Sequence, residues 1–215
     1  MVIEHIAHAQ FRILLECGIT IVTDPYDDSC GYPIVPMDAD YVLVSHQHHD
    51  HNAIRNVGGH PVAIDSVSVH TLQTGVKITA IQASHDKSDG AERGKTLLFL
   101  IEAEGLRVAH MGDIGCSLTD EQIKVLENID ILMVPVGGFF TVDEKEAMFI
   151  ANQCNAKVII PMHYKTAYNS NWPISPVECF LKNCGTDYEA APLLRVTAGD
   201  IDCLSRVMVL DRNFT

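Results

Sequence analysis

The sequence predicts a mixed α/β fold, and two features of its pattern indicate this class. In the first half, short runs of β-branched and aromatic residues are separated by turns, as in β-hairpins. In the second half, such runs alternate with helical segments, as in strand–helix units. The chain has 215 residues, of which 47% are hydrophobic and 20% are charged. It is therefore expected to bury a core as a single domain over residues 1–215.

Two β-hairpins and several single strands are predicted in the first half. The hairpins comprise residues 11–23 and 96–110, and each turns at a glycine between two apolar runs. The other elements predicted here are strands at 41–44, 61–64 and 76–81 and a short helix at 52–56.

Helices and strands are predicted to alternate in the second half. Thr119 and Gln122 have the spacing of a capping box, which opens a helix that runs to Asn128. Pro176 stands at the favoured first position of a later helix. The remaining predicted elements are a helix at 143–154 and strands at 129–134, 157–161, 193–197 and 203–210.

A dense group of metal-ligand side chains follows the strand at 41–44. Four histidines and an aspartate occur within six positions, in the order His46, His48, His49, Asp50 and His51. Imidazole together with carboxylate suits a site that holds two metal ions. In extended backbone, two residues two positions apart point the same way, so His46 and His48 can bind one ion together. A solvated loop is the alternative, but this density directly after a hydrophobic strand favours the metal site.

Two aspartates that end predicted strands have two interpretations each. Asp24, before Pro25, is either a turn residue or a carboxylate that orients a metal-binding imidazole. Asp113, after Gly112, is either a capping or turn residue or a bridge between two ions, since each of its oxygens can face one ion. His110, in the strand before it, is predicted to pack inside the protein and not to bind metal.

The His46-x-His48-x-Asp50-His51 pattern resembles the signature of the metallo-β-lactamase superfamily. The resemblance continues through shorter motifs in the same order along the chain. These are Thr23-Asp24-Pro25, Ala83-Ser84-His85-Asp86, Met111-Gly112-Asp113, Gly137-Gly138-Phe139-Phe140-Thr141 and Pro161-Met162-His163-Tyr164. Taken together, they are similar to a compact branch of Zn-dependent hydrolases that includes the L-ascorbate 6-phosphate lactonases. This resemblance implies a four-layer αββα sandwich.

The resemblance also implies a site for two divalent metal ions. One ion would be held by His46, His48 and His85, the other by Asp50, His51 and His163, and Asp113 would lie between them. Zinc is the expected metal, with manganese and iron as alternatives. A hydroxide that bridges the two ions would attack a small ester, lactone or phosphoester. Asp50 would in addition be catalytic, carrying a proton to the leaving group.

Charge and composition narrow the class of substrate. The net charge is −13, from 15 basic and 28 acidic residues, and no run of Lys or Arg could follow a phosphate backbone. A small molecule, including an anionic one, is therefore the expected partner, and nucleic acid is not. Residues beyond His163 form either ordinary surface or an aromatic and cationic rim for such a substrate, namely Tyr164, Lys165, Tyr168, Asn169 and Trp172.

Two other functions stay open at this stage. One is a phosphodiesterase that acts on nucleotides or nucleic acid, and the other is a metal-binding module without catalysis. The seven cysteines include no CxxC pair, which fits a reducing cytoplasm. Neither a secretory leader nor a segment apolar enough to span a bilayer is predicted. We therefore expect a cytoplasmic protein without membrane contact, as a monomer or an oligomer.

Overall fold

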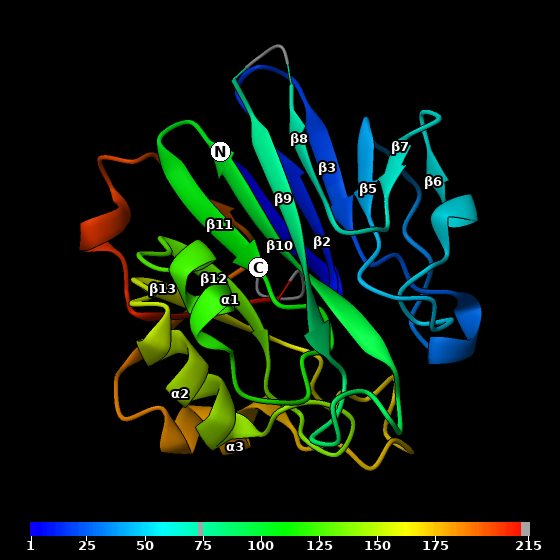
Figure 1. Ribbon diagram of the computed structural model, residues 1–215, viewed down its shortest axis with the longest axis vertical. Helices are drawn as coiled ribbons and strands as arrows, with labels where there is room; N and C mark the ends of the chain where they lie inside the picture. The colour runs from blue at the N-terminus through cyan, green and yellow to red at the C-terminus, as the bar shows by residue number, and fades with distance from the viewer. Residues whose placement is uncertain (73–74, 212–215) are drawn as a thin grey trace.

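The computed structural model describes residues 1–72 and 75–211, and within them two β-sheets pack face to face (Figure 1). The first sheet contains, in spatial order, β15 (Leu194–Arg195), β1 (Val2–Ala7), β2 (Gln10–Leu14), β3 (Thr20–Thr23), β5 (Tyr41–Leu43) and β7 (Val62–Ile64). The second contains β14 (Tyr188–Ala191), β16 (Val207–Leu210), β13 (Val158–Met162), β12 (Ile131–Pro135), β11 (Leu106–His110), β10 (Lys95–Ala103), β9 (Lys77–Ser84) and β8 (Ser68–Thr71).

The main core lies between the two sheets and comes from alternate residues of facing strands. Ile21 and Leu43 of the first sheet belong to the same cluster as Phe99 and Ile101 of β10, and all four side chains are fully buried. Successive residues of a strand point to opposite faces, so one apolar set faces the other sheet and the next set faces outward. Both faces of the central strands are thus apolar, which explains their nearly continuous hydrophobic runs.

Helices cover the outer face of the second sheet. They are α1 (Asp120–Val125), α2 (Glu144–Gln153) and α3 (Val177–Asn183), and they gather on one side of the molecule (Figure 1). Leu98 and Leu100 of β10 point away from the main core and share a buried cluster with Ala147 and Ile150 of α2. This burial of an apolar helix stripe against the sheet is what holds the helical layer in place.

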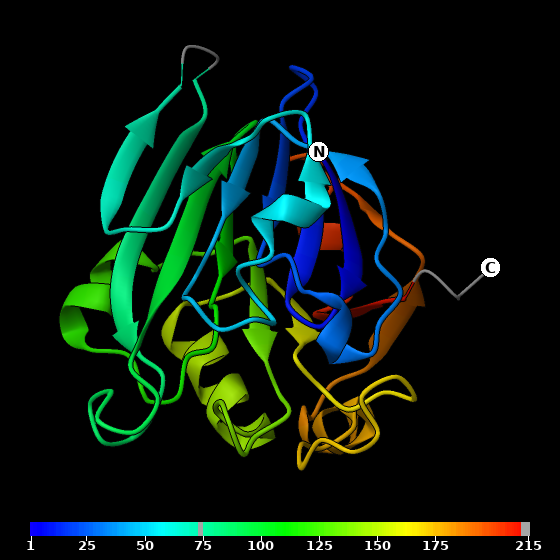
Figure 2. The same ribbon diagram turned by 90° about the vertical axis from the view of Figure 1, so that its right-hand side faces the viewer.

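Short elements cover the outer face of the first sheet. Val22 and Val42 form a buried cluster with Met37 and Val57, which belong to β4 (Met37–Asp38) and β6 (Val57–Gly58). β4 and β6 form a parallel pair beside the 3₁₀ helix η2 (Ile54–Asn56), on the side of the molecule away from the α-helices (Figure 2). The α/β class is confirmed, with facing sheets between two outer layers. One of these layers consists of such short pieces.

Most of the predicted elements are present. Both hairpins form, and Thr119 and Gln122 make the predicted capping box, with the Gln122 Oε1 accepting from the Thr119 N–H at 2.8 Å. The helix predicted at 52–56 is instead the 3₁₀ helix η2, and Pro176 is the N-cap of α3 with extended backbone, not its first helical residue.

Five strands were not predicted, namely β1, β4, β6, β8 and β14. In β1 the inward positions are Ile3 and His5, and His5 stacks on Phe11 with ring centroids 4.6 Å apart. A histidine at a core position hides the period-two pattern. In the part of the chain that the structure describes, no helix has the length and apolar character needed to cross a lipid bilayer.

Candidate metal centre

Histidines and aspartates from both sheets meet at one edge of the sandwich. Each of them directly follows or lies just beyond the end of a strand, so the two sheets bring together residues that are far apart in the sequence. His8 follows β1, Asp24 follows β3, His46 to His51 follow β5, His85 follows β9, Asp113 follows β11 and His163 follows β13. All seven residues predicted as metal ligands lie in this group. His48 is exposed, whereas the other six are buried.

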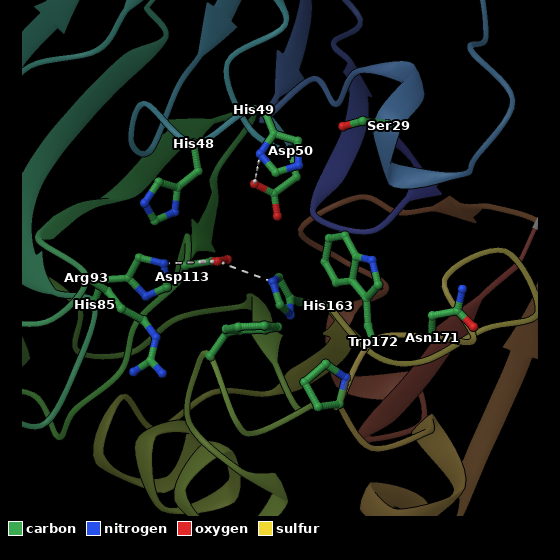
Figure 3. Close-up of a pocket in the computed structure, with 12 residues that line it drawn as sticks. Ser29, His48, His49, Asp50, His85, Arg93, Asp113, His163, Asn171 and Trp172 are labelled. Carbon is green, nitrogen blue, oxygen red and sulfur yellow. Dashed lines mark ion pairs between the residues drawn. The ribbon is translucent and has the colours of Figure 1, made fainter.

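The Asp113 carboxylate lies at the centre of the group. Its Oδ2 atom is 3.3 Å from His51 Nε2. It is also 3.2 Å from His163 Nε2 and 3.4 Å from His85 Nε2, and Figure 3 marks these two contacts with dashed lines. Two donor atoms of a tetrahedral zinc ion, each at about 2.0–2.1 Å from the metal, lie about 3.3 Å apart. The other carboxylate oxygen of Asp113, Oδ1, is buried and has no hydrogen-bond partner among the described residues. The spacing and this free oxygen both fit a carboxylate placed to bind metal.

The ligand atoms fall into two groups on either side of Asp113. Within each group, one donor atom per residue lies within 4.8 Å of every other. The first group is His46, His48 and His85, and the second is His8, Asp50, His51 and His163. A third set of His46, His51 and Asp113 meets the same limit and joins the two groups. The donors present therefore fit two ions that share a central carboxylate.

The pKa shifts of His46 and Asp113 favour the protonation states that bind metal. Burial disfavours the imidazolium form of His46, and the neighbouring His51 adds to this, so the pKa of His46 falls to about 3. Burial opposes ionisation of Asp113, but the close His163 and His51 rings outweigh it and hold its pKa well below the usual range. Neutral imidazole and ionised carboxylate are the forms that bind metal.

His51 is the exception among these rings. Burial would lower its pKa, but Asp113, Asp50 and Asp24 surround it and raise the pKa well above the ordinary value. A proton on His51 Nε2 occupies the position that a metal ion would take, because metal binding displaces protons from its ligands. The three carboxylates around this ring again fit a bound metal cation.

Asp24 orients His51 from behind. Its side chain is fully buried, and it accepts hydrogen bonds from Ser45 N at 2.7 Å, Ser45 Oγ at 2.7 Å and His51 Nδ1 at 2.9 Å. Nδ1 of His51 carries the proton shared with Asp24, and Nε2 faces Asp113. Once Nε2 loses its own proton, its lone pair is available to a metal ion. Of the two interpretations of Asp24, the geometry fits the orienting carboxylate.

Sequence reasoning missed His8. It lies in the turn between β1 and β2 with a left-handed backbone (φ 56°), and its Nε2 is 3.2 Å from Asp50 Oδ2. Its ring centroid is 4.1 Å from that of His163. Burial lowers the pKa of His8 to about 4, and the neighbouring His163 acts in the same direction, so the ring is neutral. Recognising β1 as a strand would have placed His8 in a hairpin turn, which is the one signal that could have found it.

His110 and the residues of the predicted rim lie outside the group of metal-ligand candidates. His110 is buried with Nε2 2.8 Å from the Ala9 carbonyl oxygen, and so packs inside as predicted. Asn169 is buried and accepts from Thr166 N at 2.6 Å, which makes it a loop organiser. Of the predicted rim, Trp172 lines a cavity over the metal-ligand candidates, whereas Lys165 is not among the described residues that line it.

A cavity of about 600 Å³ opens over the metal-ligand candidates (Figure 3). Its floor includes Asp50, Asp113 and His163, and its walls include Phe140 and Trp172. This volume and this mixture of apolar walls with a few polar groups are typical of small-molecule sites.

Glycine at position 137 is needed for His163 to lie where it does. A Cβ added there would be 2.2 Å from the His163 carbonyl oxygen. Gly137→Ala is therefore expected to push the His163 backbone away, lowering the free energy of unfolding by about 1–3 kcal/mol and weakening metal binding. Denaturant unfolding and a metal titration check this. Gly199→Ala is the control, since its Cβ would meet its nearest neighbour at 3.7 Å; equal behaviour of the two variants would contradict the prediction.

Known proteins resemble this chain in sequence and in structure. The pattern of the Beta-lactamase superfamily domain matches residues 2–163. A crystal structure from Thermotoga maritima, described as a Zn-dependent hydrolase of the metallo-β-lactamase superfamily, is 40% identical with a TM-score of 0.81 over 97% of each chain. A protein of Methanoculleus marisnigri named a metal-dependent hydrolase is 32% identical over 75% of this chain and 80% of its own length. One with the same name from Methanosphaera stadtmanae is 27% identical over 85% of this chain and 91% of its own length.

Proposed function

The chain belongs to the β-lactamase superfamily, and from this premise we propose that it is a metal-dependent hydrolase that uses two divalent ions to cleave a small ester, lactone or phosphoester. The observation that carries the proposal is the position of Asp113. Its Oδ2 lies within 3.4 Å of three imidazole nitrogens, at the junction of two separate groups of metal-ligand atoms. A carboxylate at such a junction can bind both ions at once.

His46, His48 and His85 would hold one ion, and Asp50, His51 and His163 the other, with His8 as an added donor to the second. Zinc suits this mixture of imidazole and carboxylate, and manganese or iron could replace it. When bound, such ions lower the pKa of water toward neutrality and polarise the oxygen of the bond to be cleaved.

The chain supplies the surroundings for this chemistry. Asp24 fixes the tautomer of His51, and the Asp50 carboxylate is held by His8 at the surface of the cavity. Burial opposes ionisation of Asp50, but His51 and His8 outweigh it and keep its pKa well below the usual range. An ionised carboxylate in this position can take a proton from water and deliver it to a leaving group. We assign this role to Asp50.

The first test is a measurement of metal content beside a hydrolysis screen. Purified protein is expected to contain about two ions per chain by elemental analysis. It is expected to hydrolyse at least one member of a panel of lactones, thioesters and phosphodiesters, and a chelator should stop this. His48→Ala removes a donor of the first group and His8→Ala a donor of the second. Each should lower the metal content toward one ion per chain.

The same experiment separates the other two functions. Turnover of phosphodiesters alone would favour the phosphodiesterase, which the net charge of −13 disfavours. Bound metal without turnover of any ester would favour a binding module. No bound metal and no turnover with any added divalent ion would overturn the proposal.

A further inference from the structure

A cation lies in the wall of the cavity above the metal-ligand candidates. Arg93 lines this cavity together with His85 and Asp113, and no other Lys or Arg is among the described residues that line it. The chain as a whole carries a net charge of −13. An anionic molecule that approaches such a protein is repelled unless a local positive charge offsets the field. Arg93 is placed to supply such a charge in the wall, in addition to the ions proposed for the floor.

The loop that carries Arg93 is fixed to its neighbour His85. The buried Asp86 carboxylate accepts four backbone N–H bonds across this loop, from Ser88 at 2.8 Å, Gly90 at 2.8 Å, Glu92 at 3.0 Å and Arg93 at 2.8 Å. The loop closes where His85 N donates to Gly94 O at 3.1 Å. The backbone of Arg93 is thus held relative to a metal-ligand candidate, and a binding group that is fixed in advance loses less entropy when it binds.

The guanidinium itself is left with donors to spare. In the described part of the chain its side chain makes no hydrogen bond to a protein acceptor, and its ion pair with the exposed Glu92 is long, at 3.7 Å. Arginine carries five N–H donors in a planar fork that matches a carboxylate or phosphate. By contrast, Arg107 is engaged by Glu102 at 2.7 Å and by the Val125 carbonyl oxygen at 2.8 Å.

Aromatic rings complete this part of the cavity. The Arg93 Cζ atom is 5.8 Å from the centre of the Phe140 ring, and that ring is 6.2 Å from Trp172 in an edge-on arrangement. Arg93 lies beside His85, across the view from Trp172 (Figure 3). An apolar substrate body can therefore contact the rings while an anionic group reaches the guanidinium.

We propose that Arg93 binds a carboxylate or phosphate substituent of the substrate, so that the enzyme prefers small anionic esters or lactones over neutral ones. This rests on the proposed hydrolase function. Arg93 would act in substrate recognition, separately from the groups that cleave the bond.

The test compares γ-butyrolactone with its γ-carboxylate, which differ in one anionic group. Wild-type holoenzyme is expected to prefer the carboxylate. Arg93→Met should lower kcat/KM for the carboxylate by about 10- to 100-fold, mainly through KM, and leave that for the neutral lactone nearly unchanged. Arg93→Lys should lie between, because a lysine keeps the charge without the fork. Arg12→Met is the control, since Arg12 pairs with Glu4 at 2.7 Å and is similarly exposed.

Calorimetric binding of 2-hydroxyglutarate and 4-hydroxybutyrate, the two hydrolysis products, gives a second measurement that needs no turnover. Arg93→Met should weaken the first by about 10- to 100-fold and spare the second. Equal losses for both products, or no loss for either, would overturn the assignment of Arg93. If the wild-type enzyme binds both products but cleaves neither lactone, the hydrolase proposal loses support for this substrate class, and the binding comparison still decides the role of Arg93.

Discussion

An Asp113→Asn variant is expected to lose at least about 100-fold in kcat/KM and to retain less than the full complement of metal. Asp113 Oδ2 lies within 3.4 Å of the Nε2 atoms of His51, His85 and His163. An asparagine has the same shape but presents one neutral oxygen and an NH₂ group, and the NH₂ group cannot bind a cation. Two ions would then face each other without the negative charge that separates them. Elemental analysis and steady-state kinetics check this.

Asp187→Asn is the matched control, because it makes the same chemical change at an exposed position. It should leave both metal content and activity unchanged. Loss of metal would assign Asp113 to the metal centre if the metal-free variant unfolds like the metal-free wild type. An Asp113→Asn variant with two ions and full activity would show that the central carboxylate has no part in the reaction.

The strands and the main histidine motif could be predicted from the sequence because their signals are local. Residues 41–44 form a continuous apolar run, and β5 (Tyr41–Leu43) has apolar neighbours on both faces. Directly after it, the ligand-type residues stand so close together that no folding is needed to see them as a group. For Asp113 the sequence left a turn residue and a bridge between two ions both open, and the structure brings it into contact range of His51 and His163.

Residues that reach the site through turns and loops could not be predicted. His8 adopts a left-handed backbone (φ 56°) in a hairpin whose first strand has a histidine at a core position, so neither the turn nor the strand shows in the pattern. Arg93 reaches the cavity because Asp86 folds the loop between them, which depends on four hydrogen bonds to backbone groups. Such contacts are possible for many sequences. Lys165, two positions after His163, was the cation that the sequence suggested for the site, but it is not among the described residues that line the cavity.

Asp24→Asn should have the second largest effect, although Asp24 would touch neither metal nor substrate. Asparagine fits the site, since it has the same size and tolerates the left-handed backbone found there (φ 38°). The hydrogen bonds do not fit. If the amide oxygen keeps the bond from Ser45 N, the NH₂ group faces His51 Nδ1, and the ring must accept there instead of donating. The one proton of a neutral His51 ring is then held on Nε2, the atom that would bind metal.

This change of tautomer is expected to weaken metal binding by about 10- to 100-fold and to lower the free energy of unfolding of metal-free protein by about 1–3 kcal/mol. Competition with a chromogenic chelator measures the first quantity, denaturant unfolding the second, and the ¹⁵N shifts of His51 report the tautomer. Ser45→Ala separates the causes at the second group of ligands. It removes the 2.7 Å bond from Ser45 Oγ to Asp24 and the 2.9 Å contact of Ser45 Oγ with His46 Nδ1, but it leaves the carboxylate that holds His51. That variant should lose stability and keep both the His51 tautomer and the affinity for the second ion. If Asp24→Asn binds metal as tightly as Ser45→Ala, Asp24 is a packing residue and the second ion does not depend on the tautomer of His51.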